Sequence, residues 1–271
     1  MNISVIIPFF NGFDFFAETL LSIARQTYNV QQIIVINDGG GHEAEEFLSN
    51  FNGIKIINLE KNQGPSAARN IAIKLVTSEW IAFCDADDIW QPSKLEQQVK
   101  FMSENTIFSA CHTGVTTFNQ EGDIATFIDK PYDLQLSEAI EISYVTPPSL
   151  LIKKSALEQV NYFDTQLKCS EDHDLTIRIL EQGYKIGFVN QPLIKVRRMN
   201  HGNITSNGRN ILKGNLQLFK KNYHIYKRYD GARTLFLYRA FMTAGGKSQG
   251  LERKILFTIG KVISLTNPHL R

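Results

Sequence analysis

Three carboxylates stand close together at the end of a short apolar run. Asp85, Asp87 and Asp88 follow residues 81–84, and an apolar run closed by a turn signal is typical of a buried strand. Carboxylates this close repel one another and lose hydration, so they need a compensating cation. A hard divalent ion such as Mn²⁺ or Mg²⁺ takes oxygen ligands and is often held by one or two carboxylates together with substrate phosphates. The alternative is a solvated acidic turn before a helix, and this segment alone does not decide between the two.

A second acidic group opens a helix predicted over residues 170–182. It contains Glu171, Asp172 and Asp174. Asp172 shares a helix face with Leu175 and Ile179, so we expect it to point toward the protein, where a half-buried carboxylate is suited to act as a general base. The alternative is that acids in a first helical turn only complement the helix dipole.

The elements that must position these groups alternate between strand and helix. Apolar runs predict strands at 4–9, 32–36, 53–57 and 81–84, with helices predicted over 14–27, 43–51 and 65–76 between them. This alternation is typical of an α/β, doubly wound nucleotide-binding fold with a mostly parallel central sheet. The glycine fingerprints of dinucleotide-binding and P-loop proteins are absent. Further along, helices are predicted over 93–104 and 134–142, and strands within 107–128 and at 149–152, 185–189 and 193–197.

In such a sheet, ligands bind beyond the carboxyl ends of the strands. The first, second and fourth strands would deliver Asn11, Asp38 and the acids at 85–88 to one edge. Asp38 could accept a hydrogen bond from a pyrimidine imide, and Arg69 could meet a diphosphate or brace the carboxylates. The alternatives are an Asx-turn at Asp38 and a surface arginine at Arg69.

Five short motifs in this chain resemble those of the family 2 inverting glycosyltransferases with the GT-A fold. They stand in the family's order and rough spacing over about residues 3–205, at 8–11, 37–39, 62–70, 85–88 and 171–174. The resemblance implies a GT-A domain over 1–205, followed by a C-terminal helical extension over 206–271. It also implies metal-dependent transfer of a sugar, with inversion, from a nucleotide-sugar donor such as a UDP-sugar to a saccharide or lipid-linked saccharide in surface polysaccharide synthesis.

The resemblance also assigns roles to single residues. Asp172 would be the catalytic base, Asp87 and His201 would be ligands of Mn²⁺ or Mg²⁺, and Glu171 and Trp90 would lie on the acceptor side. The nucleotide sugar would contact Pro8, Phe10, Asn11, Asp38, Gly64, Arg69, Asp85, Ala86 and Asp87.

Three departures from the family pattern accompany this resemblance. Asn37 stands where the family commonly has an aspartate, and 161–164 reads Asn-Tyr-Phe-Asp where Gly-Gly-Phe-Asp is frequent. His201 comes one residue later than the histidine of the family's Arg-x-His motif. A plain loop histidine is therefore the alternative to a metal ligand at His201.

The charge distribution separates the tail from the rest of the chain. Residues 201–271 hold 13 Lys and Arg against two acids, whereas 1–200 hold 16 basic and 25 acidic residues. In 206–271 these cations alternate with Phe and Tyr, which suits an interfacial helix on an anionic membrane. A helical lid with a solvated basic face is the alternative. Nucleic acid would attract the same charge, but no RNA-binding module is recognisable, so we expect no nucleic-acid partner.

The remaining composition points to a cytoplasmic protein. Three widely spaced cysteines indicate neither a disulfide framework nor a structural zinc site, and Met1–Ser4 shows no basic leader. We therefore expect a cytoplasmic protein that is peripheral at the inner face of the cell membrane if the tail binds lipid. Two other functions fit a nucleotide fold: a sugar-phosphate nucleotidyltransferase, and a non-catalytic sugar-binding protein. The first should carry a Gly-rich basic loop after strand one, which the segment 8–12 is not.

Overall fold

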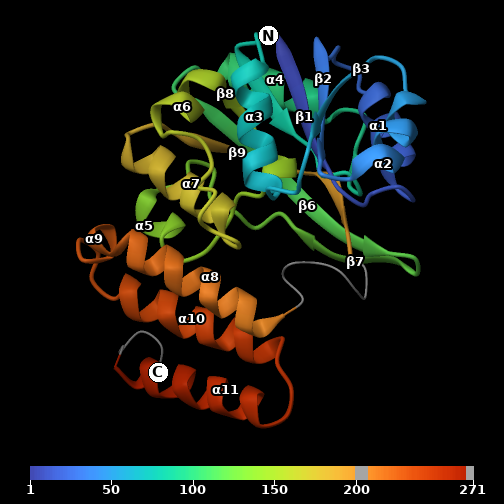
Figure 1. The fold of residues 1–271 in the computed structure, drawn as a ribbon. Helices are drawn as coiled ribbons and strands as arrows, with labels where there is room; N and C mark the ends of the chain where they lie inside the picture. The colour runs from blue at the N-terminus through green and yellow to red at the C-terminus, as the bar shows by residue number, and fades with distance from the viewer. Residues whose placement is uncertain (199–206, 267–271) are drawn as a thin grey trace. The chain divides into compact units, whose positions relative to one another are not determined.

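The computed structural model describes residues 1–198 and 207–266 (Figure 1). The chain forms two compact units. Unit 1 comprises Met1–Leu134, Val145–Phe163 and Arg178–Arg198, and unit 2 comprises Gln135–Tyr144, Asp164–Ile177 and Met199–Arg271. The division differs from a single boundary at 205/206, because two internal segments join the tail in unit 2.

Within the described residues, unit 1 contains a sheet of nine strands. Four strands are parallel, in the order β3-β2-β1-β4 (Figure 1). Strand β8 is antiparallel to its two neighbours, β4 and β6. Strand β6 runs parallel to β9. At the edges, β5 is antiparallel to β9 and β7 is antiparallel to β6. This arrangement confirms the predicted α/β fold with a mostly parallel sheet. The strands are β1 (Ile3–Phe9), β2 (Gln32–Asp38), β3 (Ile54–Leu59), β4 (Trp80–Phe83), β5 (Ile89–Trp90), β6 (Ala110–Asn119), β7 (Gly122–Phe127), β8 (Leu151–Lys153) and β9 (Ile186–Arg197).

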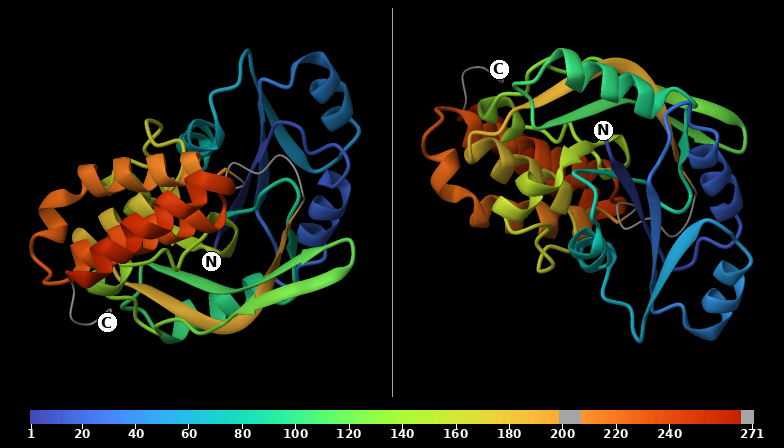
Figure 2. Two further views of the ribbon diagram at one scale, coloured as in Figure 1. Left: turned by 90° about the horizontal axis from the view of Figure 1, so that it is seen from below. Right: turned by 90° about the horizontal axis from the view of Figure 1, so that it is seen from above.

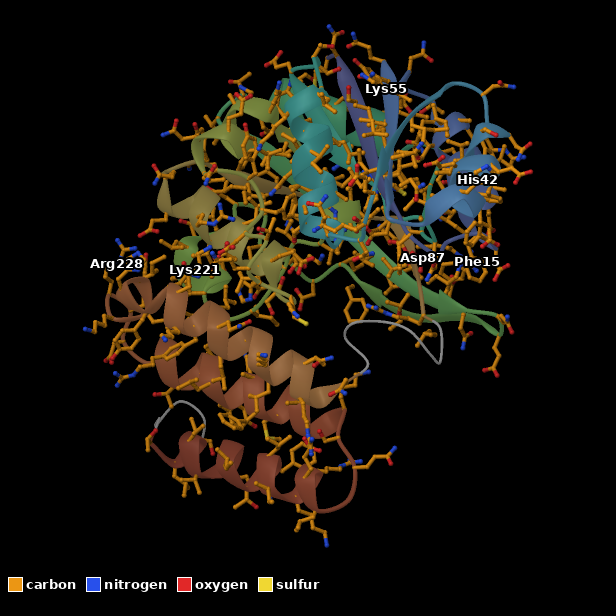
Figure 3. The ribbon with its side chains drawn as sticks, in the orientation of Figure 1. Phe15, His42, Lys55, Asp87, Lys221 and Arg228 are labelled. Atoms are coloured by element: carbon orange, nitrogen blue, oxygen red, sulfur yellow. The ribbon has the colours of Figure 1, made fainter. Side chains whose placement is uncertain are left out.

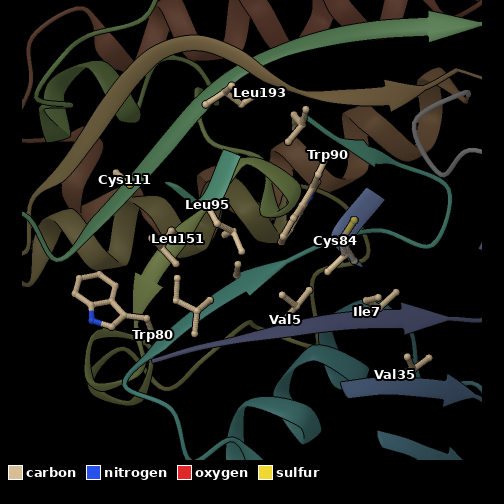
Figure 4. Packing of buried hydrophobic residues seen from close by; sticks show 14 of the residues in the cluster. Val5, Ile7, Val35, Trp80, Cys84, Trp90, Leu95, Cys111, Leu151 and Leu193 are labelled. Carbon is tan, nitrogen blue, oxygen red and sulfur yellow. The ribbon is translucent and has the colours of Figure 1, made fainter. Parts of the chain in front are cut away.

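Helices cover both faces of the parallel strands. Helices α1 (Phe16–Ala24) and α2 (Gly41–Ser49) lie on one face and α3 (Pro65–Leu75) on the other (Figure 2). Successive strand residues point to opposite faces, so an unbroken apolar run such as that of β1 can supply both cores. The alternate residues Val5 and Ile7 pack with Val35 and with Leu95 of α4 (Lys94–Glu104) (Figure 4).

Strand β9 differs from its prediction. Two short strands were expected at 185–189 and 193–197, yet Ile186–Arg197 is one strand of 12 residues. Its pairing with β6 shifts register where Thr113 opposes Val189 and Gly114 opposes Pro192, so two residues of β9 bulge out of the ladder. Proline has no N–H to donate to the ladder, which interrupts the pairing locally without ending the strand. The elements β5 and α6 (Lys154–Gln159) were not predicted. The strand expected at 149–152 begins only at Leu151, because a 3₁₀ helix occupies Pro147–Ser149.

Unit 2 is built mainly from helices. Its core contains Leu218, Ile225, Tyr226 and Phe236. Two aromatic side chains of the basic tail are therefore packed inside the unit, since Tyr226 is 1% and Phe236 is 4% exposed. No helix among residues 1–198 and 207–266 is both long and apolar enough to cross a membrane. The helices are α5 (Leu136–Ala139), α8 (Gly208–Lys221), α9 (Tyr223–Tyr226), α10 (Ala232–Gly246), α11 (Gly250–Leu265) and the first part of α7 (Glu171–Glu181).

Candidate functional site

The carboxyl ends of β1, β2 and β4 form one edge of the parallel sheet. Asn11, Asp38 and Asp85 follow or end these strands, which pair in parallel register. In Figure 3, Asp87 lies at this edge beside Phe15, whereas Lys55, near the start of β3, lies at the opposite one. The fold therefore brings together the polar residues that were predicted to meet.

The loop after β1 packs directly against the acidic loop after β4. A Cβ added to Gly12 would lie 2.9 Å from the Cβ of Ala86, so a larger residue there would push the two loops apart. The hydroxyl of Thr19 in α1 donates to the carbonyl of Ala86, at 3.1 Å. These contacts fix the backbone between Asp85 and Asp87 from the side of α1.

Asp38 joins the loop after β2 to the loop before α3. Its two carboxylate oxygens accept from the backbone N–H groups of Gln63 and Gly64, at 2.7 and 2.8 Å, and the residue is 3% exposed. Gly39 has φ +77°, and a Cβ there would lie 2.2 Å from the Asn62 nitrogen. Asp38 therefore makes long-range bonds and does not form the local Asx-turn that was the alternative. Its contact with a pyrimidine remains a prediction.

Arg69 braces the acidic loop. Its Nη2 lies 2.6 Å from Oδ1 of Asp85, and the arginine side chain is 4% exposed. The guanidinium carbon also lies 5.5 Å from the ring centre of Phe163. Of the two functions considered for Arg69, the structure contains the bracing contact. A direct contact with a diphosphate remains a prediction.

The carboxyl groups of Asp87 and Asp88 have little access to water. Burial raises the pKa of Asp87, and the neighbouring charge of Asp85 raises it further. Burial, followed by the charges of Asp85 and Asp87, holds the pKa of Asp88 well above its usual range. One Asp88 oxygen accepts from the Arg197 N–H at 3.1 Å, while the other is buried without a hydrogen-bond partner. Crowded carboxylates with an unused buried oxygen fit a nearby divalent cation, which would relieve their repulsion.

Arg197, at the end of β9, holds the acidic loop from the other side. Its Nε donates to the carbonyl of Asp87 at 3.1 Å, and its Nη2 lies 2.5 Å from Oε2 of Glu18. The guanidinium carbon lies 4.1 Å from the ring centre of Phe15 and 4.5 Å from that of Phe118. Sequence reasoning missed this residue, because the antiparallel pairing of β5 with β9, which sets Ile89 opposite Lys195, brings it to Asp87 from more than 100 residues away.

The second acidic group lies in unit 2. Asp172 is half-buried, as its helix position predicted, and its Oδ1 accepts from the His173 N–H at 2.7 Å. Glu171 is half-buried as well. Asp174 is buried and joins α7 to the end of α8, because Lys221 Nζ lies 2.9 Å and Asn222 Nδ2 lies 3.2 Å from its oxygens. Asp174 is thus a structural acid.

Not every predicted site residue is brought to the edge of the sheet. Asp87 belongs to unit 1 and Asp172 to unit 2, so their meeting across one site remains a prediction. Trp90, expected on the acceptor side, is 1% exposed and lies in the hydrophobic core with Lys94 Nζ 3.9 Å from its ring centre, so the structure does not support contact between its indole and an acceptor. His201 lies outside the described residues. Among the described residues, no group of three His, Cys, Asp or Glu side chains is arranged to hold a metal by itself.

The remaining nucleotide-side residues lie in the same three loops or beside them. Phe10 is 44% exposed directly after β1, and Pro8 is half-buried within that strand. Gly64 has φ +89° immediately before Pro65, the first residue of α3. A proline in the first helical turn after this glycine is the helix start that the sequence predicted. Apolar side chains and backbone groups therefore lie at the same edge of the sheet as Asp38, Asp85 and Asp87.

Known proteins are similar to this chain in sequence and in fold. The chain is 33% identical over 201 residues to an uncharacterized glycosyltransferase of Rickettsia bellii, covering 72% of this chain and 29% of that protein. It therefore spans about a third of the length of the first Rickettsia relatives it matches. It is 25% identical over 233 residues to the putative teichuronic acid biosynthesis glycosyltransferase TuaG of Bacillus subtilis, covering 84% of this chain and 88% of TuaG.

Solved structures share the architecture at lower sequence identity. The crystal structure of S. aureus TarS 1–349 in complex with UDP-GlcNAc has a TM-score of 0.72 and 18% identity, covering 99% of this chain and 82% of that one. At this identity the likeness shows the fold, which is GT-A. The family model described as glycosyl transferase family 2 matches residues 4–160, more than half of the sequence. The chain belongs to glycosyl transferase family 2.

Proposed function

We propose that this chain transfers a sugar, with inversion at the anomeric carbon, from a UDP-sugar to a hydroxyl of a saccharide or lipid-linked saccharide. The observation that carries the proposal is the preformed edge of the sheet, where Asp38, Arg69 and Asp85 are held by mutual or backbone contacts. Such rigid positioning is what a transfer reaction needs, because aligned reactants lose little further entropy on the way to the transition state.

The nucleotide half of the donor would bind at the loops that Asp38 and Arg69 organise. The Asp38 carboxylate would face the pyrimidine, and Asp85, braced by Arg69, would lie near the ribose or the sugar. Complexes of TarS with UDP-GlcNAc and with UDP show that the same fold holds this class of ligand in that protein. This support comes from the fold alone, and the identity of the donor is our proposal.

Asp87 would ligate Mn²⁺ or Mg²⁺, with His201 as a second protein ligand. The raised pKa of Asp87 and the unused oxygen of Asp88 support a cation at this loop. When bound, the ion neutralises the charge that grows on the departing diphosphate. Arg197 holds the Asp87 carbonyl, so that the carboxylate keeps its direction.

Asp172 would act as the base. It would take the proton from the acceptor hydroxyl as that oxygen attacks the anomeric carbon from the face opposite the diphosphate, which gives inversion. A positioned base of this kind contributes roughly 10²–10⁴-fold to the rate. Glu171 would lie on the acceptor side. The name of TuaG, a putative teichuronic acid biosynthesis glycosyltransferase, supports polysaccharide synthesis as the role of the transfer. A lipid-linked precursor as acceptor is part of our proposal.

Calorimetric titration of UDP, with and without Mn²⁺, tests the proposal. We expect Mn²⁺ to strengthen UDP binding to the wild type and to have no such effect on Asp87→Ala. Asp129→Ala, which removes an exposed carboxylate of unit 1, is the matched control and should behave like the wild type. A donor screen that measures released nucleoside diphosphate then identifies the sugar. Equal UDP binding with and without the metal would contradict metal dependence, and the absence of UDP binding would favour a non-catalytic protein.

A further inference from the structure

Helix α11 is apolar on two opposite faces. Its inner face packs against α10 within unit 2, with Leu256 7% exposed and Gly260 beside Met242. Five further aliphatic side chains point away from that face. They are Leu251 (74% exposed), Ile255 (49%), Ile259 (38%), Val262 (57%) and Leu265 (60%).

These five side chains form one continuous stripe. At 100° per residue they fall within a sector of about 120° on the side opposite Leu256 and Gly260, in which Thr258 is the one polar residue of the helix. A helix on the surface of a unit normally has a single apolar stripe, which faces its core. Single exposed aliphatic residues are ordinary, but a contiguous exposed patch marks an interaction surface. The stripe on α11 is of the second kind.

The charges beside the stripe are almost all positive. Lys254 and Lys261, two helical turns apart, follow one margin of the stripe, and Arg253 lies over the Phe257 ring at 5.4 Å. The one acid of the helix, Glu252, is paired with Arg209 at 2.9 Å. An apolar stripe bordered by lysines is the pattern of a helix that lies in the surface of an anionic bilayer.

We propose that the outward face of α11 docks onto anionic phospholipid. The five aliphatic side chains enter the boundary between headgroups and acyl chains, and Lys254 and Lys261 contact the headgroup phosphates. The docking surface depends on the helix alone, whereas its use, which is to bring the enzyme to a lipid-linked acceptor, rests on the proposed function.

This surface differs from the one suggested by the sequence. Contact of the tail's aromatic residues with lipid was one of the alternatives, but Phe219 stacks on Phe236 at 6.0 Å within unit 2, and Tyr226 joins them there. The lipid-facing residues are instead the aliphatic ones of α11. The charge pattern of the sequence does not distinguish these residues from aliphatic residues of the core.

A second copy of the chain is the less suitable occupant. A 16-residue helix is about 24 Å long, so a stripe about 10 Å wide presents roughly 240 Å², against about 800 Å² per partner in a standard interface. A symmetric contact would also repeat the lysines of one copy beside those of the other, while Glu252 is already paired with Arg209. Anionic lipid satisfies both the charge and the shape of the stripe.

Sedimentation of the full chain with lipid vesicles tests the inference. Wild-type protein should bind vesicles that contain phosphatidylglycerol more tightly than vesicles of phosphatidylcholine alone, and added salt should weaken that binding. The triple variant Leu251→Gln, Ile255→Gln, Val262→Gln should bind on the order of 100-fold more weakly, which corresponds to losing the burial of about three to four methylenes at about fourfold each. Lys254→Gln with Lys261→Gln should cost about 25-fold on anionic vesicles only, at about fivefold for each lysine.

The control variant is Ile107→Gln with Ile124→Gln, which removes two exposed aliphatic residues of unit 1 (64% and 56%) and should bind vesicles like the wild type. Far-UV circular dichroism checks that every variant is folded, as expected for exposed positions.

Three results would overturn the inference: no preference for anionic vesicles, an unchanged triple variant, or a wild-type dimer in analytical ultracentrifugation that the triple variant dissociates. UDP titration is independent of all three. Weak UDP binding with intact vesicle binding would count against the proposed function alone.

Discussion

The contact between Arg197 and the acidic loop gives the most informative perturbation. Arg197→Met keeps an apolar stem between Phe15 and Phe118 but removes the charge and every side-chain donor. Arg197→Lys keeps the charge but loses the planar fork that donates to Asp87 and Glu18 in fixed directions. Comparing the two variants separates the effect of charge from the effect of geometry.

The magnitude follows from the individual contacts of Arg197. A hydrogen bond from a charged donor to a buried carbonyl contributes about 1.5–3 kcal/mol, and a cation above an aromatic ring about 0.5–1 kcal/mol. The pair with Glu18 adds little, because the Glu18 side chain is 56% exposed. With one such hydrogen bond and the two rings of Phe15 and Phe118, we expect Arg197→Met to lower the free energy of unfolding by roughly 2.5–5 kcal/mol, and Arg197→Lys by about half as much.

Two assays check this prediction. Urea unfolding measures stability, and calorimetric titration of UDP with Mn²⁺ measures whether the loop keeps its shape. Both variants should weaken UDP binding, since lysine cannot restore the direction of the Asp87 carbonyl. Lys195→Met is the matched control, because Lys195 in the same strand pairs at 2.8 Å with the 54%-exposed Asp123 and should contribute less than about 1 kcal/mol. Wild-type stability and UDP affinity in Arg197→Met would refute the reasoning.

Two further predictions concern the proposed base and a buried lysine. Asp172→Asn should lower turnover by about 10² or more while UDP affinity stays nearly unchanged; steady-state rates and titration check this, and equal loss of both would assign Asp172 to binding. Burial lowers the pKa of Lys94 to about 7. Between that pH and about 10.4 the unfolded chain then holds a proton that the folded protein lacks, so this residue makes stability rise with pH by up to about 1.4 kcal/mol per pH unit. Lys94→Met removes this titrating group. In urea unfolding at pH 7, 8 and 9, the free energy of unfolding of the wild type should therefore rise relative to that of Lys94→Met. A constant difference between the two would contradict the burial argument.

The parallel half of the fold was predictable because its signals are local. Apolar runs that end in polar turns fixed β1, β2 and β4, and Pro65 marked the start of α3. The rule that ligands bind at the carboxyl ends of parallel strands then brought Asp38 and Asp85 to one edge without any long-range information. The bracing of Asp85 by Arg69 was one of two alternatives that this reasoning left open.

The residues that escaped prediction depend on distant pairings or on packing. Arg197 reaches Asp87 through the antiparallel pairing of β9 with the two-residue strand β5, which has no local signature. Trp90 was assigned to the acceptor side but lies in the core. The sequence cannot separate these two places, because an aromatic residue near a site looks the same whether it fills the core or lines a cleft. The outward stripe of α11 has the same helical period as a core stripe, and only burial distinguishes them.

The two hydrogen bonds that Asp38 accepts have a consequence for engineering this chain. They tie the end of β2 to residues 63 and 64, and the close approach of Gly39 to Asn62 leaves no slack between those segments. Exchanging or lengthening the loop within 60–64 would therefore also move the Asp38 carboxylate. A change in base selectivity measured in such a variant could not be assigned to the loop alone. The exposed hairpin tip at 120–122, between β6 and β7, carries no such restriction and is the place to add a tag or label.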